Sequence, residues 1–244
     1  MDTLLQALIL GGVSGFSNFI GGLFSFLLPI SKRRLGLIMA FGAGALIASM
    51  SFGLMEEGFR QGGLDATALG MLAGAGTYYL FHRLFLHHAG PKGLHFRNPS
   101  AQSGLNILLA SILDGLPEQF AIGVGLAAGT NLGFLVMLSA FLAGVPEGIS
   151  GTETLAPFWG RGKVSLYWVG LGVLCTLVTV AGFLVAELIP GDFLGFLLAF
   201  AGGSVLAMLA DTMLPEAFRQ GGSIISVVTV AGFMLSFVFS RLQM

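Results

Sequence analysis

Apolar residues run along the chain in long blocks separated by short polar connections, and this pattern predicts membrane-spanning helices. A helix needs roughly 20 mostly apolar residues to cross a bilayer, and eight such blocks can be delimited. The longest polar connection is HHAGPKGLHFRNPSAQ, residues 87–102. We expect one transmembrane domain over residues 1–244, with spans at about 3–28, 36–58, 65–86, 104–128, 131–156, 164–188, 193–214 and 222–241.

The composition agrees with this pattern. Hydrophobic residues make up 55% of the chain, charged residues only 9%, and the mean hydropathy is +0.90. A soluble domain carries about 25% charged residues, so the sequence predicts an all-α polytopic membrane protein. The lipid bilayer is its expected surrounding, and no nucleic-acid partner is expected. The single cysteine, Cys175, excludes an internal disulfide and argues against a cysteine-cluster metal site.

The basic residues are distributed unequally between the two sides of the predicted spans. Two of the 11, Arg60 and Arg241, fall on one side. Cytoplasmic loops carry an excess of Lys and Arg, so we expect both termini outside. The basic residues of the other side are Lys32, Arg33, Arg34, Arg83, Lys92, Arg97, Arg161, Lys163 and Arg219.

Two short segments recur along the chain. EEGFRQGG (56–63) recurs as PEAFRQGG (215–222), and DGLPEQ (114–119) recurs as AGVPEG (143–148). The members of each pair lie in spans whose numbers differ by an odd number, 2 and 7 for the first pair and 4 and 5 for the second, so they run in opposite directions through the bilayer. Inverted repeats with helices broken near the midplane are typical of secondary transporters. We therefore expect eight helices arranged as 3+2+3 with inverted repeats.

Three acids fall inside predicted spans 4 and 5. Asp114 and Glu118 are four residues apart, which places them on one helix face. Glu147 takes the equivalent position in span 5. Pro117 and Pro146 each remove a helical hydrogen bond and leave a carbonyl free one turn earlier. The three carboxylates and the two free carbonyls together indicate an oxygen-lined site for a divalent cation. The charge of the cation would offset the cost of burying the acids.

The alternative interpretation is that these acids pair with basic residues and only hold helices together. No Lys or Arg lies at a comparable depth in any predicted span. Ionisable groups at membrane depth usually mark a functional site. The acids therefore require a cation or protons as partner.

The Pro-Glu segments LPEQFAIG and VPEG resemble the fourth- and fifth-span motifs of the ZIP (Zrt/Irt-like) metal-ion transporters. In that family span 4 typically reads His-Asn-x-x-Glu-Gly and span 5 His-x-x-Pro-Glu-Gly. LADTMLPEAF (209–218) is similar to the family's seventh span. The resemblance is closest to a compact bacterial branch, which implies the bacterial cytoplasmic (inner) membrane.

The family's metal-binding glutamates match Glu118 and Glu147. Asp114 stands where the family usually has histidine, and an aspartate can still coordinate a metal. No match was found in span 6 for the acid that some members contribute there, so one metal site is expected rather than two. At three positions where the family has polar residues, this chain has Gly115, Ala143 and Gly144, which offer no side-chain ligand.

The resemblance implies a divalent metal ion as transported substrate, moved towards the cytoplasm, and no resident cofactor. Zinc favours nitrogen and sulfur ligands, whereas an all-oxygen cage favours harder ions such as manganese. The resemblance to this family makes zinc the expected substrate, with manganese, iron or cadmium as alternatives. A homodimer is an open alternative to a monomer.

Four further polar residues are second candidates for metal ligands. Asp211 lies where ZIP-like sequences place histidine or acid in the exit path. Glu57 and Glu216 either contribute to the site or lie solvated at the interface. Gln119 either supplies an amide oxygen or makes an interhelical hydrogen bond. The histidines near the 3–4 loop either gather metal or lie solvated at the interface, and they are His82, His87, His88 and His95.

Two other functions remain as alternatives. The paired acids could serve a transporter of a non-metal cationic or proton-coupled substrate. An intramembrane enzyme would need a nucleophile with its base, or a zinc motif such as His-Glu-x-x-His. The sequence contains no such motif, so we do not expect an enzyme.

Overall fold

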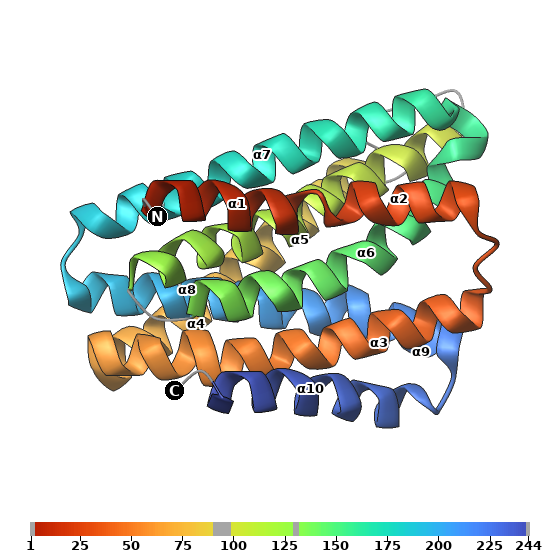
Figure 1. Ribbon diagram of the computed structural model, residues 1–244. Helices are drawn as coiled ribbons and strands as arrows, with labels where there is room; N and C mark the ends of the chain where they lie inside the picture. The colour runs from red at the N-terminus through yellow and green to blue at the C-terminus, as the bar shows by residue number, and fades with distance from the viewer. Residues whose placement is uncertain (1–2, 90–98, 129–131, 243–244) are drawn as a thin grey trace.

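The chain forms long helices joined by short connections (Figure 1). The computed structural model describes residues 3–89, 99–128 and 132–242, and for residues 85–89, 99–110, 113–114, 187 and 242 it describes the backbone alone. The elements in order are α1 (Thr3–Gly15), α2 (Ser17–Leu27), α3 (Lys32–Ser49), η1 (Met50–Met55), α4 (Glu56–Ala89), α5 (Pro99–Ala127), α6 (Leu132–Trp159), α7 (Arg161–Leu188), α8 (Gly191–Met208), η2 (Leu209–Met213), α9 (Leu214–Gly221) and α10 (Ile225–Leu242).

Five stretches of the described residues are long and apolar enough to cross a membrane. The longest, Lys32–Leu84, has 53 residues, more than twice what a single crossing needs. It is not straight, because Gly63 has a non-helical φ of 69° and ψ of −172°, and the chain turns back there (Figure 1). The all-α membrane class is thus confirmed, whereas the count of eight spans and their 3+2+3 arrangement stay predictions.

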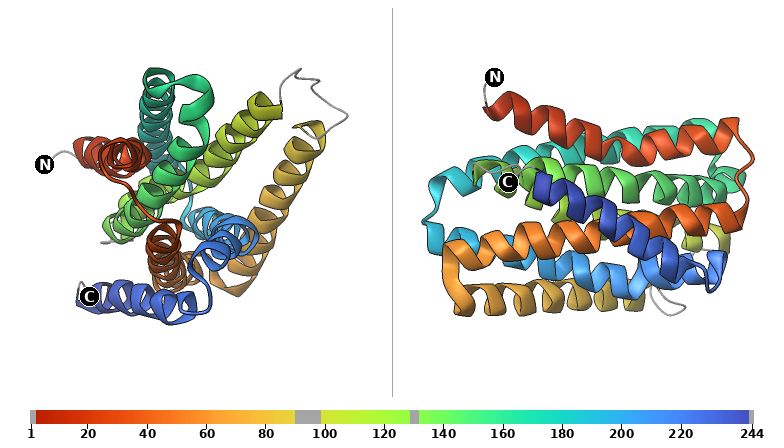
Figure 2. Two further views of the ribbon diagram at one scale, coloured as in Figure 1. Left: turned by 90° about the vertical axis from the view of Figure 1, so that its right-hand side faces the viewer. Right: turned by 60° about the horizontal axis from the view of Figure 1, so that its bottom comes forward.

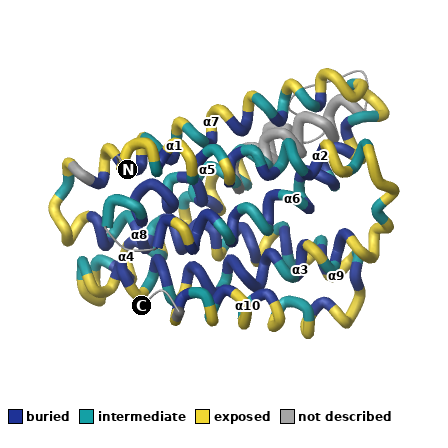
Figure 3. Tube along the Cα trace, in the orientation of Figure 1, coloured by how far each residue is buried: buried dark blue, intermediate teal, exposed yellow. Residues whose placement is uncertain are grey.

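The outer faces of the helices carry large apolar side chains. Leu72 of α4, Leu166 of α7 and Val227 of α10 are 72%, 71% and 68% exposed. The buried residues follow the sides of α3, α6 and α8 that face the middle of the bundle (Figure 3). An apolar exterior around a packed interior is what a bilayer surrounding requires.

Each copy of the EEGFRQGG repeat lies in the same local structure. A π-helical segment precedes each copy: η1 ends at the residue before the first copy, and η2 ends one residue earlier relative to the second. Each copy ends at a glycine with positive φ, Gly63 at 69° and Gly222 at 74°. The two copies lie at opposite ends of the bundle, and their helices run in opposite directions (Figure 1). The repeat is therefore inverted in the structure.

The same relationship extends into the helices before each repeat. Gly44 of α3 and Gly203 of α8 are separated by the same number of residues as Glu57 and Glu216. A Cβ on Gly44 would clash with a backbone carbonyl of α10, and a Cβ on Gly203 would clash with one of α4. Small residues allow this close backbone approach between membrane helices. The crossings α3–α10 and α8–α4 are thus equivalent.

Two predicted spans can be compared with the helices that occupy them. The first, 3–28, corresponds to the apolar stretch Thr3–Leu27, in which Phe16 separates α1 from α2. The seventh, 193–214, continues as η2 and α9 to Gly221, because the chain remains helical until the positive φ of Gly222.

The connections that carry most of the basic residues gather at one end of the bundle. The α2–α3 and α6–α7 connections and α9 lie at this end, whereas the turn after η1 and the α7–α8 connection lie at the other (Figures 1 and 2). The beginning of α1 and the end of α10 also lie at that other end. This arrangement agrees with the charge asymmetry in the sequence, although which end is cytoplasmic stays a prediction.

Candidate metal site

Two glutamates, one from each Pro-Glu segment, line the same cavity inside the bundle. Glu118 follows Pro117 in α5, Glu147 follows Pro146 in α6, and both helices continue through their proline. The space that a water-sized particle can occupy there is about 10 Å³, roughly what one water molecule needs. The cavity therefore has room for about one water molecule or one ion of similar size.

The two carboxylates lie away from the surface of the protein. Glu118 is only 7% exposed, and Glu147 is half-buried. Carboxylates inside a bilayer are costly and mark ion or proton pathways. A cation between them would offset this cost.

The third predicted ligand, Asp114, has a side chain outside the described residues. Its backbone lies in α5, one turn before Glu118, so its part in the site stays a prediction. Among the side chains that the structure describes, no group of three or more His, Cys, Asp or Glu residues is arranged to hold a metal ion. A site with three acidic ligands therefore depends on Asp114.

A thiol lines the same cavity, which sequence reasoning missed. Cys175 of α7 is 3% exposed and lines the cavity with Glu118 and Glu147. Its Sγ lies 3.6 Å from the place where a Cβ on Gly115 would be. A sulfur-bearing residue thus lines the cavity beside the two carboxylates, whereas the ligand set, which was expected to be all oxygen, stays a prediction. The sequence carries no signal for this position, because Cys175 lies in an apolar block without a repeat or motif.

The first span also contributes polar side chains to the cavity, and sequence reasoning missed them too. Ser14 at the end of α1, and Ser17 and Asn18 at the start of α2, line the cavity. Ser111 of α5 adds a fourth polar residue. Three polar residues within positions 14–18 of an otherwise apolar block are a signal that could have been used.

Gln119 makes interhelical hydrogen bonds at the edge of the cavity. Its Nε2 donates to Ser14 Oγ at 2.8 Å, and its Oε1 accepts from Thr179 Oγ1 at 2.9 Å. The side chain is 3% exposed and connects α5 with α1 and α7. The structure thus shows the interhelical hydrogen bonds, and the alternative role, an amide oxygen for the metal, stays a prediction for this cavity-lining residue.

The carbonyl that Pro146 leaves free does not face the cavity. This is the oxygen of Leu142, which lies 2.9 Å from the place where a Cβ on Gly42 would be. Gly42 belongs to α3 and does not line the cavity. This backbone oxygen is therefore directed at α3 rather than at the two carboxylates.

Asp211 lies outside the cavity and pairs with a histidine. Its Oδ2 is 2.8 Å from His82 Nδ1, and the two side chains are 50% and 23% exposed. The His82 ring also stacks on Tyr78, with centroids 5.6 Å apart. This pair joins η2 to α4. The side chains of His87 and His88, and His95 as a whole, lie outside the described residues.

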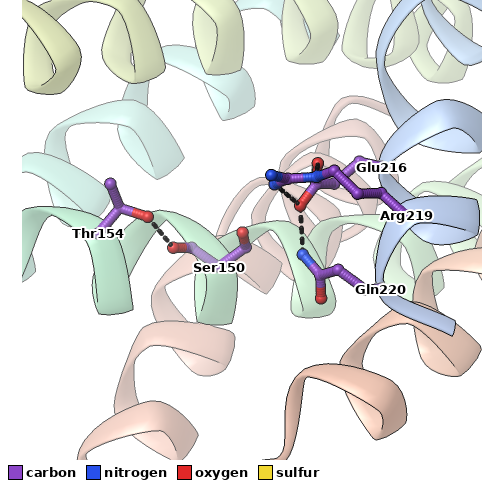
Figure 4. Close-up of polar contacts among 5 residues, drawn as sticks. All are labelled: Ser150, Thr154, Glu216, Arg219 and Gln220. Carbon is purple, nitrogen blue, oxygen red and sulfur yellow. Dashed lines mark hydrogen bonds and ion pairs between the residues drawn. The ribbon is translucent and has the colours of Figure 1, made fainter.

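Glu57 and Glu216 are likewise separate from the cavity. Glu57 is 8% exposed and accepts from Arg60 at 3.0 Å and from Gln61 at 2.8 Å. Glu216 has matching partners in Arg219 and Gln220 (Figure 4). The structure therefore does not bring these two second candidates to Glu118 and Glu147.

Comparison with known proteins gives modest similarity to zinc transporters. No protein-family model matches the chain. A putative zinc transporter of Arabidopsis thaliana is 26% identical over 204 residues, which cover 82% of this chain and 33% of that protein. The human zinc transporter SLC39A7 is 27% identical over 139 residues, or 54% of this chain and 30% of its own length. The mouse protein of the same name is 24% identical over 139 residues.

The chain thus spans about a third of the length of the curated relatives it matches. Their names support the resemblance to the ZIP transporters that the Pro-Glu segments suggest. These relatives are plant and mammalian proteins, so the similarity does not show that the chain belongs to a bacterial branch.

Proposed function

We propose that the chain transports divalent metal cations across a membrane, with zinc as the first substrate and manganese, iron or cadmium as alternatives. The observation that carries the proposal is that Glu118 and Glu147, from two related segments on neighbouring helices, line one buried cavity. The named relatives are zinc transporters, which favours this substrate class and agrees with a protein that is not an enzyme.

The site of the proposed transport comprises Glu118 and Glu147 with Asp114 one turn away. The ion would exchange water for these oxygens, and Cys175 would add a sulfur atom at the wall. Sulfur suits zinc and cadmium better than manganese, so this thiol strengthens the case for zinc. Binding at a buried midpoint and release to the other side are how secondary transporters work.

The proposed architecture has eight spans in one domain over residues 1–244, arranged as 3+2+3. The inverted pair of EEGFRQGG segments and the equivalent glycine crossings support it. With the basic connections on the cytoplasmic side, both termini lie outside and the ion moves inward. The bacterial inner membrane is the proposed location, and a homodimer remains an alternative to the monomer.

Metal uptake into proteoliposomes tests the proposal. Purified protein should carry Zn²⁺ inward at a saturable rate, and Glu118→Ala and Glu147→Ala should each abolish most of that uptake. Asp192→Ala, which removes an exposed acid at the start of α8, is the control and should transport normally. If both glutamate variants carry zinc at the rate of the unaltered protein, the proposed site is wrong.

A transporter of a non-metal cation would give a different result. Its uptake of the organic substrate would still depend on Glu118 and Glu147, but the purified protein would bind neither Zn²⁺ nor Mn²⁺. Calorimetric titration with both metals separates the two functions.

A further inference from the structure

The first span is broken at the level of the cavity, and the break presents two oxygen-bearing side chains to it. Only Phe16, at φ −86° and ψ 3°, separates α1 from α2. Ser17 and Asn18 follow directly and line the cavity together with Glu118 and Glu147. Ser17 is 2% exposed, and its Oγ donates to Asn18 Oδ1 at 3.2 Å. A carbonyl oxygen has two lone pairs, so Asn18 Oδ1 keeps one for another partner.

Gly144 of α6 makes the room for these two oxygens. A Cβ at this position would lie 2.7 Å from Asn18 Oδ1 and would clash with Ser17 Oγ. One turn further, a Cβ on Gly148 would clash with the backbone oxygen of Asn18. Glu147 is three residues after Gly144, which places both on one face of α6. The oxygens of the first span thus occupy the space that a side chain of α6 at position 144 would fill.

The three acids of the proposed site and Cys175 offer enough ligand atoms for zinc, but they leave the coordination of a harder divalent cation incomplete. Zinc takes four ligands, and harder ions such as manganese take six oxygens. Amide carbonyls are ordinary ligands of hard cations. Resting on the proposed function, we infer that Asn18 Oδ1 is a metal ligand of this cavity, supported by Ser17 Oγ, and supplies from the first span the oxygen that α6 lacks at Gly144.

A neutral ligand at this position has a consequence for transport. An additional carboxylate at position 18 would attract the cation more strongly and slow its release, whereas an amide adds a ligand without adding charge. The Asn18→Asp change should therefore tighten metal binding. It should also slow turnover, because release becomes harder.

Calorimetric binding of Mn²⁺ and Cd²⁺ to the purified full chain tests the inference. Asn18→Ala should weaken Mn²⁺ binding by about tenfold or more, the range seen when a supporting metal contact is removed. Cd²⁺ binding should be weakened less, because the sulfur of Cys175 remains as a ligand. A merely structural role of Asn18 would weaken both metals equally.

Thr154→Ala is the matched control. This exposed threonine also lies on a polar stretch of α6, but its Oγ1 donates to Ser150 O at 2.9 Å within its own helix (Figure 4). Its loss should leave both affinities unchanged.

An exchange of ligands between helices makes the test sharper. In the triple variant Ser17→Gly, Asn18→Ala, Gly144→Asp, the first two changes remove the oxygens that would clash with a side chain at 144. The new carboxylate should restore the Mn²⁺ affinity that Asn18→Ala loses. Gly144→Asp alone should not bind normally, because Ser17 and Asn18 still occupy the space.

The outcomes separate this inference from the proposed function. A protein that binds neither ion, or whose affinity does not depend on Glu118 and Glu147, would refute the proposed function and this inference with it. The inference alone is refuted if metal affinity depends on both glutamates but Asn18→Ala leaves it unchanged. It is also refuted if Asn18→Ala reduces the affinity for Mn²⁺ and Cd²⁺ equally. If Asn18→Ala does not fold, the isosteric Asn18→Asp decides, and Mn²⁺ affinity that does not rise contradicts the inference.

Discussion

Glu57 and Glu216, at opposite ends of the molecule, each accept hydrogen bonds from an arginine and a glutamine of their own helix. Each carboxylate accepts hydrogen bonds from an arginine three residues later and from a glutamine four residues later. Two residues after each glutamine, the chain turns at a glycine of positive φ, Gly63 or Gly222. A π-helical segment, the carboxylate with its partners, and the glycine turn therefore form one unit that the fold uses twice in opposite directions.

The turn of this unit should depend on glycine. Gly63→Ala and Gly222→Ala each force a side chain into a backbone region that is essentially restricted to glycine, at a cost of order 1–3 kcal/mol. Thermal unfolding in detergent should show a lower Tm for both variants. Gly76→Ala, in the regular part of α4 where a Cβ would meet no atom within 4 Å, should be neutral or slightly stabilising. An unchanged Tm for both turn variants would contradict the backbone argument.

The two equivalent crossings should respond alike to an added methyl group. Gly44→Ala and Gly203→Ala place a Cβ against a backbone carbonyl of the crossing helix, and such overpacking costs about 1–3 kcal/mol or more. Each variant should lower the thermal stability by a similar amount. Gly170→Ala, which meets no atom within 4 Å, is the control. If only one crossing were sensitive, the equivalence of α3–α10 and α8–α4 would be wrong.

Cys175 provides a built-in probe of the cavity, because the chain has no other cysteine. Cd²⁺ bound at Glu118 and Glu147 should shield the thiol and slow its reaction with a small methanethiosulfonate, followed by mass spectrometry. The protection should disappear in Glu118→Ala and in Glu147→Ala. Equal labelling rates with and without Cd²⁺ would place the ion elsewhere.

Asp114→His should shift the metal preference. An imidazole nitrogen in place of a carboxylate oxygen favours zinc and cadmium over manganese, so the ratio of zinc to manganese uptake should rise several-fold. Asp65→His adds the same side chain at an exposed position of α4 and serves as control. A selectivity profile that matches the unaltered protein would remove Asp114 from the selection of the metal.

That Glu118 and Glu147 line one cavity was predictable from the repeated Pro-Glu segment. The repeat identified the two residues, and its copies lie in consecutive spans, which run antiparallel and can bring the two residues to one cavity. The α-helical membrane class was equally accessible, since it depends on the length and composition of the apolar blocks.

Cys175 and Asn18 were not predictable in the same way. Cys175 lies in an apolar segment with no repeat or motif, and its place at the cavity depends on how α7 packs against α5. Asn18 lies just after Phe16, which is neither a glycine nor a proline, so the sequence contains no sign that α1 and α2 are separated there. The position of Asn18 at the cavity depends on the close approach of α2 to Gly144 and Gly148, a contact between residues more than a hundred positions apart.

The glycine crossings have a consequence for the order of assembly. α4 has been synthesised before α8, so the crossing at Gly203 can form as soon as α8 enters the membrane. The crossing at Gly44 must wait for α10, which is synthesised after every other described helix. Two crossings that are equivalent in the finished molecule therefore form at different times, and Gly44 of α3 meets its partner helix only after every other described helix has been synthesised.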